Sequence, residues 1–428
     1  MTSAPPAARR VFVASLVGTT IEFFDFYIYA TAAVLVFPRL FFPAGDPAAA
    51  TLQSLATFAL AFLARPIGAV AFGHFGDRRG RKATLVAALL TMGLSTVVIG
   101  LLPTYAQVGV IAPVALALCR LGQGLGLGGE WGGAVLLAIE NAPPGKRAWY
   151  GMFPQLGAPI GFVCSSAVFL LLARWTGEQQ FLDWAWRIPF LCSALLVGVG
   201  LWVRLRLVET PEFARAMDNA ERVRVPLAAV LRLHVRPLAL GALAGVSTFL
   251  VFYMMTVFSL GWGTSQLHFA RPTFLLLQMA AVPALAIAIP VSALIAGRRG
   301  TRSALLLAAC TVLAVGVAYP LLFGNGTSWG AWLAMSLGFW AMGLSYGPLG
   351  TLVSGLFPVA VRYTGASLAF TLAGIIGASF SPAIATWLAV HHGLGAVGWF
   401  IASAGLVSLL ALLPMARDPG GHANATGQ

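Results

Sequence analysis

The chain has 428 residues, of which 59% are hydrophobic and only 9% are charged. A soluble globular domain carries about 25% charged residues, so this composition excludes a soluble protein and indicates a chain whose solvent is mostly lipid. The formal net charge of +13 would suit a nucleic-acid-binding protein, but the placement of the basic residues along the chain explains it without nucleic acid.

The first apolar run follows Arg9 and Arg10, as a secretory signal peptide would. Glu22 and Asp25 interrupt this run, and it continues to Phe37, which is longer than the apolar core of a signal peptide. The run therefore predicts a retained first transmembrane helix.

Apolar runs of about 20 residues, the length that crosses a bilayer, occur twelve times. We therefore expect an all-α membrane protein with twelve transmembrane helices. The expected spans are residues 11–37, 52–72, 83–103, 108–138, 149–173, 186–207, 237–262, 273–297, 303–323, 329–357, 364–390 and 394–416.

The basic residues are distributed unequally between the two sides of these spans. Twenty of the 26 Lys and Arg residues fall in alternate connections that would share one side with the N-terminus. By the positive-inside rule this side is the cytoplasm, so both termini are expected there. The remaining six are Arg39, Arg174, Arg187 and Arg271 on or near the outer side, and Arg65 and Arg120 within spans.

The longest polar connection separates the sixth and seventh spans. We interpret residues 1–207 as one six-helix bundle, 208–236 as a cytoplasmic linker, and 237–428 as a second six-helix bundle with a short cytoplasmic tail. Residues 73–82 and 293–302 carry similar arginine- and glycine-rich turns at matching positions of the two halves, which is typical of transporters built from two parallel repeats.

Short strings point to a known family. Residues 73–82 resemble the signature loop of the major facilitator superfamily, and Arg120-Leu-Gly-Gln-Gly124 resembles its Arg-x-x-Gln-Gly motif. The order and spacing of further strings resemble the metabolite:H⁺ symporter family, whose members import shikimate, 2-oxoglutarate, citrate, or proline and betaine. These strings are Glu22-Phe-Phe-Asp-Phe-Tyr27, Arg65-Pro-Ile-Gly68, Gly128-Gly-Glu-Trp-Gly-Gly133, Trp186-Arg-Ile-Pro-Phe190 and Phe357-Pro-Val-Ala-Val-Arg-Tyr-Thr-Gly365.

The resemblance implies a major facilitator fold of two pseudo-symmetric bundles in a bacterial inner membrane, working by alternating access. It also implies that the loop containing Gly73, Asp77, Arg78, Gly80 and Arg81 acts as a gate, in which Asp77 ties to a neighbouring helix end. The basic residues of this loop serve topology as well. The corresponding second-half turn has Gly297 where the superfamily often has aspartate, so it lacks that carboxylate.

Five charged residues lie away from the ends of the expected spans, all in the first half: Glu22, Asp25, Glu130, Arg65 and Arg120. Such a charge costs about 2.5–3.5 kcal/mol on insertion scales and marks a functional site by default. We expect the acids to carry protons, since Glu22 and Asp25 share a helix face where two like charges oppose each other's ionisation. An arginine fork suits a substrate carboxylate, so Arg65 and Arg120 are candidate anchors, facing the acids across a central cavity.

The alternative for these charges is a static network of buried ion pairs that fixes helix packing. Glu130 stands among glycines and could instead tie neighbouring backbones. Gln155, Tyr253, Gln278 and Tyr346 are further candidate substrate contacts, for which interhelical hydrogen bonding or simple packing is the alternative. Four tryptophans near predicted helix ends suggest an interfacial belt: Trp184, Trp186, Trp262 and Trp329.

Together these features predict a monomeric, proton-coupled symporter that imports a small carboxylate-bearing metabolite, either an organic acid or a zwitterion. Its partners would be the solute, protons and the lipid bilayer, with no nucleic acid, metal or cofactor. An exporter of the same fold using proton antiport is the first alternative. A polytopic membrane enzyme or sensor is the second, although no nucleophile motif, metal cluster or appended soluble domain supports it.

Overall fold

The computed structural model describes residues 6–42, 46–79, 81–128, 135–136, 138–139, 142, 145–205, 226–358 and 361–415. These residues are mainly helical, and no strand occurs among them. Eight helical stretches in this part of the chain are long and apolar enough to span a membrane, the last of them covering two crossings. Val86–Leu101 adds a shorter apolar helix.

The first six crossings follow the predicted spans closely. They are α1 (Pro6–Leu35), α3 (Pro47–Arg79), α4 (Arg81–Leu101), α6 (Ile111–Gly128), α8 (Arg147–Gly151) continued by α9 (Gly157–Trp175), and α11 (Ile188–Leu205). Short helices stand in the connections: α2 (Phe37–Leu40), α5 (Tyr105–Val108) and α10 (Glu178–Asp183).

The second six crossings begin after α13 (Pro226–Leu233), which lies within the predicted linker. They are α14 (Val235–Tyr253) continued by α15 (Ser259–Ser265), α16 (Arg271–Arg299), α17 (Thr301–Phe323), α18 (Ser328–Gly355), α19 (Arg362–Gly374) and α20 (Ser381–Leu412). α20 holds parts of two crossings, because Gly393 has a φ of 77° that breaks the helix. The twelve predicted crossings are therefore confirmed.

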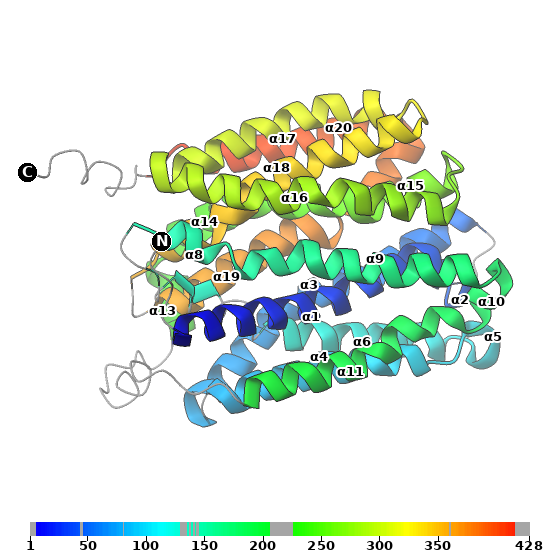
Figure 1. The fold of residues 1–428 in the computed structure, drawn as a ribbon, viewed down its shortest axis with the longest axis horizontal. Helices are drawn as coiled ribbons and strands as arrows, with labels where there is room; N and C mark the ends of the chain where they lie inside the picture. The colour runs from blue at the N-terminus through cyan, green and yellow to red at the C-terminus, as the bar shows by residue number, and fades with distance from the viewer. Residues whose placement is uncertain are drawn as a thin grey trace, which may run out of the picture.

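The helices run side by side along the long axis of the molecule (Figure 1). α1 begins and α20 ends at the same end, while α2, α5 and α10 gather at the opposite end (Figure 1). The first six crossings form one layer and most of the second six form another, with α9 and α16 adjacent at their boundary.

Equivalent helices of the two halves pack in the same pairs. α1 packs on α9, α3 on α6, and α4 on α11; in the second half α14 packs on α19, α16 on α18, and α17 on α20. Between the halves, α9 contacts α16, and α3 contacts α19 and the π-helical turn Ile375–Ser379 that follows it. The packing therefore repeats the duplicated plan that the arginine-rich turns suggested.

Glycines at matching places bring the paired helices close together. A Cβ on Gly128 of α6 would lie 2.1 Å from the Arg65 carbonyl oxygen of α3, and a Cβ on Gly347 of α18 would lie 2.7 Å from the Ile289 carbonyl oxygen of α16. Real Cβ atoms do not approach a carbonyl oxygen that closely. Small residues thus let the backbones of α3 and α6 touch at the level of Arg65, as transmembrane interfaces commonly require.

Replacing Gly128 by alanine is therefore expected to lower the free energy of unfolding by about 1–3 kcal/mol through overpacking. The separation of α3 from α6 would also displace Arg65. Thermal unfolding of the purified protein in detergent measures the first effect. Gly198 of α11 is the matched control, since a Cβ there meets nothing within 4 Å. Equal melting temperatures for Gly128→Ala and Gly198→Ala would contradict the packing argument.

The predicted tryptophan belt is wrong for Trp186. Its side chain is fully buried, with the rings of Phe37, Phe41 and Phe190 about it and the Arg187 guanidinium 4.6 Å from it. Trp186 lies at a helix end, but its side chain points into the bundle. Trp184 and Trp329 are exposed, as residues of an interfacial belt are.

Candidate functional site

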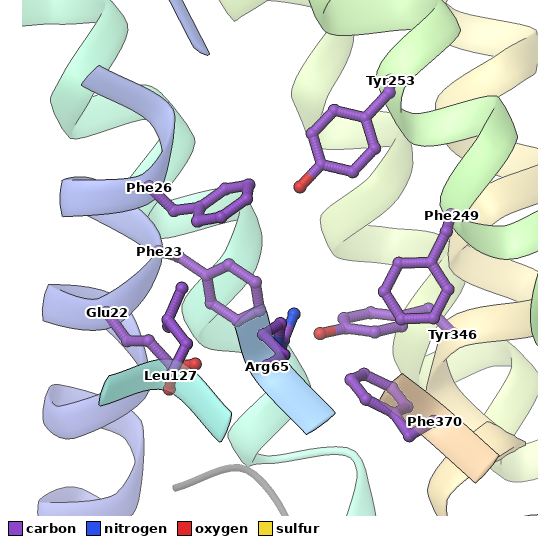
Figure 2. A pocket seen from close by; sticks show the side chains of 9 residues that line it. All are labelled: Glu22, Phe23, Phe26, Arg65, Leu127, Phe249, Tyr253, Tyr346 and Phe370. Atoms are coloured by element: carbon purple, nitrogen blue, oxygen red, sulfur yellow. The ribbon is translucent and has the colours of Figure 1, made fainter. Parts of the chain in front are cut away.

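A small cavity lies between the two halves near the middle of the crossings. The first half contributes residues of α1, α3 and α6, and the second half contributes residues of α14, α18 and α19. Its volume of about 30 Å³ leaves room for little more than a water molecule. The lining residues are Glu22, Phe23, Phe26, Arg65, Leu127, Phe249, Tyr253, Tyr346 and Phe370 (Figure 2).

Arg65 is the one cation among the described residues of this lining. Its residue is 8% exposed, and its Nε has no hydrogen-bond partner among the described residues. Figure 2 shows the hydroxyl groups of Tyr253 and Tyr346 on the side of the cavity toward which Arg65 points. A buried guanidinium nitrogen without a partner is costly, and an anion is the kind of group that would satisfy it.

Asp25 takes a different position from Glu22, although the two are three residues apart on α1. Asp25 is fully buried and does not line the cavity. The Ser193 hydroxyl of α11 donates a hydrogen bond to its Oδ1, and Thr96 of α4 lies close to it. Oδ2 has no partner in the described part of the chain. Asp25 therefore faces α4 and α11 inside the first half, while Glu22 faces the second half.

Arg120 is fully buried in a cage of three rings. Its guanidinium carbon lies 4.3 Å from the centroid of Phe26, 4.0 Å from that of Tyr29 and 4.9 Å from that of Phe58. Its Nε donates to the Phe58 carbonyl oxygen at 3.3 Å. Cation–π contacts and this hydrogen bond hold the charge within the bundle, beside the cavity rather than in its lining.

Side-chain hydrogen bonds run from Arg120 through Gln123 to Thr96 of α4, whose own hydroxyl donates to the Met92 carbonyl oxygen. The Arg120 Nη1 donates to Gln123 Oε1 at 2.9 Å, and Gln123 Nε2 donates to Thr96 Oγ1 at 2.8 Å. The sequence analysis placed acids directly opposite arginines, whereas in the structure Arg120 binds Gln123 and Asp25 binds Ser193. Gln123 belongs to the Arg-x-x-Gln-Gly string and could have been singled out there; Thr96 and Ser193 carry no signal in the sequence.

Gln278 and Gln155 are both buried, but neither lines the cavity. The Gln278 side-chain amide donates to the carbonyl oxygens of Met255 and Thr256 at 2.9 and 2.7 Å. These carbonyls belong to the π-helical turn Met254–Phe258, so Gln278 satisfies backbone groups that the turn frees. Neither amide atom of Gln155 has a partner among the described residues.

Glu130 and Gly80 lie outside the residues that the structure describes. Gly73, Asp77 and Arg78 fall within α3, and Arg81 begins α4, but the side chains of this stretch also lie outside the described part. The gate that the resemblance implies at this loop stays a prediction. No group of three or more His, Cys, Asp or Glu side chains that could hold a metal ion occurs among the described residues.

A larger cavity of about 890 Å³ occupies the end of the molecule where α2 and α10 lie. Glu178 of α10 accepts a hydrogen bond from Arg39 at 2.6 Å and one from Arg271 at 3.2 Å, so it links the first half to the first turn of α16 in the second half. The hydrogen bond from Arg39, together with the charge of Arg271, holds the pKa of Glu178 below its usual range. We call this space the outer cavity.

Residues 10–233 match the sugar (and other) transporter family, which is more than half of the chain. The chain is 53% identical over 410 residues to the inner membrane metabolite transport protein YhjE of Escherichia coli (strain K12), covering 95% of this chain and 93% of that protein. The chain belongs to the major facilitator superfamily. It is also 35% identical to the shikimate transporter of E. coli, over 90% of this chain and 88% of that protein.

Other relatives extend the similarity within the superfamily. The chain is 31% identical to the proline/betaine transporter of Salmonella typhimurium, over 89% of this chain and 77% of that protein. These relatives agree with the resemblance to metabolite:H⁺ symporters that the sequence motifs carry. The crystal structure of a D-xylose-proton symporter superposes with a TM-score of 0.74 over 96% of this chain and 99% of that one, at 18% identity. That likeness shows the major facilitator fold. The family match and the relatives of higher identity show that the protein is a membrane transporter.

Proposed function

We propose that the protein is a proton-coupled symporter that imports a small carboxylate-bearing metabolite by alternating access. The observation that carries the proposal is Arg65, whose partly unsatisfied guanidinium lines a cavity formed by both halves. A group between the halves meets solute from either side when the halves move. The relatives named for shikimate and for proline and betaine support the solute class, since all three solutes carry a carboxylate.

The lining also narrows the solute class. It holds six aromatic rings, one guanidinium and one carboxylate, and the two tyrosine hydroxyls are its remaining polar groups among the described residues. A polyhydroxylated sugar needs several amide or hydroxyl partners, whereas a compact carboxylate with an apolar or cationic body matches this lining. We therefore propose an organic acid or zwitterion rather than a sugar.

The coupling of proton and solute would depend on the buried acids and arginines of the first half. Glu22 shares the cavity with Arg65, and Asp25 and Arg120 are both fully buried within the first half. Protonation of an acid in this set removes a negative charge that competes with the substrate carboxylate. Proton and anion then bind more tightly together than separately, which is the reciprocal coupling that symport requires.

Uptake into membrane vesicles tests this function. We expect right-side-out vesicles with an acidic exterior to accumulate a labelled carboxylate from a panel that includes betaine, proline, shikimate and 2-oxoglutarate. Dissipation of the pH gradient should abolish the accumulation. An exporter would instead accumulate the solute in everted vesicles that are acidic inside, and that result would replace symport by antiport.

The proposed orientation places the outer cavity outside the cytoplasm and both termini inside. Ser328 and Arg299 are exposed at opposite ends of the second half, so they report the two sides. In a version lacking the four native cysteines, Ser328→Cys should react with a membrane-impermeant thiol reagent in intact cells, and Arg299→Cys only with a permeant one. The reverse pattern would invert the topology.

We further propose that the two bundles, 1–207 and 237–428, move as units about the linker 208–236. The central cavity is built from one chain, so a monomer contains every group that the mechanism uses.

A further inference from the structure

The same aromatic pattern, Phe-x-x-Phe-Tyr, occurs in the first helix of each half. α1 carries Phe23, Phe26 and Tyr27, and α14 carries Phe249, Phe252 and Tyr253. α1 and α14 are equivalent helices, because each packs on the fifth crossing of its own half. The duplication therefore presents the same three rings from both halves at the same level of the bundle.

The rings of the two patterns contact each other reciprocally across the boundary. The centroids of Phe26 and Tyr253 are 6.2 Å apart in an edge-to-face contact, and those of Tyr27 and Phe252 are 5.1 Å apart in a stack. In each half, the second phenylalanine of the pattern thus contacts the tyrosine of the other half. All four residues are buried, none more than 5% exposed.

Neighbouring rings widen these contacts into a layer. On one side Phe58 and Phe62 of α3 contact both Phe26 and Tyr253. On the other side Phe162 of α9 contacts Tyr27 and Phe252, and Phe339 of α18 contacts Phe252. We call these eight residues the aromatic layer: Phe26, Tyr27, Phe58, Phe62, Phe162, Phe252, Tyr253 and Phe339.

The aromatic layer stands between the two cavities. Phe26 and Tyr253 line the central cavity, where Figure 2 shows them facing each other from the two halves. The outer cavity is lined by later residues of the same two crossings, Val34 and Leu35 in the first and Val257 and Gly261 in the second. A solute that passes from the outer cavity to Arg65 must therefore cross the layer.

We propose that the duplicated Phe-x-x-Phe-Tyr patterns form the outer gate of the central cavity, which opens when Tyr27 separates from Phe252 and Phe26 from Tyr253. Ring pairs of this kind add only modest stabilisation beyond their buried area, so separating them in each transport cycle costs little free energy. Because the contacts are reciprocal, one movement of the halves breaks both cross pairs together. The proposal concerns access to the cavity and holds for whichever solute the protein carries.

Access of a thiol reagent to the central cavity tests the gate without any substrate. The reporter is Leu127→Cys, in a version in which Cys119, Cys164, Cys192 and Cys310 are replaced, and the impermeant reagent is added outside right-side-out vesicles. Loss of a cross pair in Tyr27→Leu or Phe252→Leu should raise the labelling rate about 2- to 12-fold. The double variant should gain little beyond either single one, because each change already removes the same pair.

Two further variants separate the gate from general loosening. The exchanged pair Tyr27→Phe with Phe252→Tyr keeps two stacked rings and should label at the original rate. Phe323→Leu is the control, since Phe323 is equally buried but stacks on Tyr319 within α17 of one half, 5.0 Å away, and should leave the rate unchanged. Methionine replaces leucine at 27 or 252 if a leucine variant does not purify as a folded protein. Unchanged labelling in both single variants, or an equal rise in the Phe323 control, would overturn the proposal.

Discussion

Replacing Asp25 by asparagine is expected to abolish proton-driven accumulation of substrate while leaving membrane insertion and downhill exchange intact. Asparagine keeps nearly the same volume and an oxygen that can accept the Ser193 hydrogen bond, but it cannot bind and release a proton. A carboxylate that is fully buried in the first half, with one oxygen lacking a partner among the described residues, is the group best placed to need that proton.

Vesicle uptake under an imposed pH gradient, compared with counterflow in its absence, separates accumulation from exchange. Asp183→Asn is the control, because Asp183 is an exposed acid of α10 far from the bundle interior. If Asp25→Asn vesicles still concentrate substrate to the normal ratio, the proton site lies elsewhere. Glu22 in the central cavity is then the residue to replace by glutamine.

Replacing Arg65 by lysine is expected to weaken substrate affinity about 10- to 100-fold with little change in thermal stability. Lysine keeps the charge but loses the planar fork that pairs two hydrogen bonds with a carboxylate. The expectation rests on Arg65 lining the central cavity with an Nε that has no partner in the described residues. The concentration dependence of uptake gives the affinity.

Arg120→Lys is the matched comparison and should show the opposite pattern. Its guanidinium lies over three rings and donates to Phe58 and Gln123, so its loss is expected to lower the free energy of unfolding by about 1–3 kcal/mol. Affinity should change less than in Arg65→Lys. A large loss of affinity for Arg120→Lys together with a neutral Arg65→Lys would exchange the two roles. A best substrate that is a cation without a carboxylate would reject an arginine anchor altogether.

The outer end of the molecule adds a second contact between the halves. Arg271 reaches Glu178 across the outer cavity, beyond the aromatic layer. Glu178 is exposed, and exposed ion pairs contribute about 0–1 kcal/mol, so this pair alone would bias rather than lock the closed outer end. The four rings of the two cross pairs are buried, none more than 5% exposed, so the proposed gate and this ion pair would act together.

The sequence by itself determined the crossings, their expected orientation and the intramembrane charges, because hydropathy and loop charge are properties of local stretches of chain. The span predicted at 303–323 is α17 within two residues, and the neighbouring predictions 364–390 and 394–416 are divided in the structure at Gly393. Arg65, Tyr253 and Tyr346 were also selected from the sequence, and they line the central cavity.

Only the tertiary structure decided which way each charged side chain faces. Glu22 and Asp25 are three residues apart on one helix, yet one lines the cavity and the other binds Ser193, 168 residues away in the sequence. Arg65 and Arg120 are both buried, but ring contacts from α1 and α3 enclose Arg120, and Gly128 lets α6 approach α3 at Arg65. The rotation of a helix about its axis is set by contacts with segments distant in the chain. A periodic apolar sequence surrounded by lipid does not specify that rotation, because lipid and a neighbouring helix accept the same apolar residues.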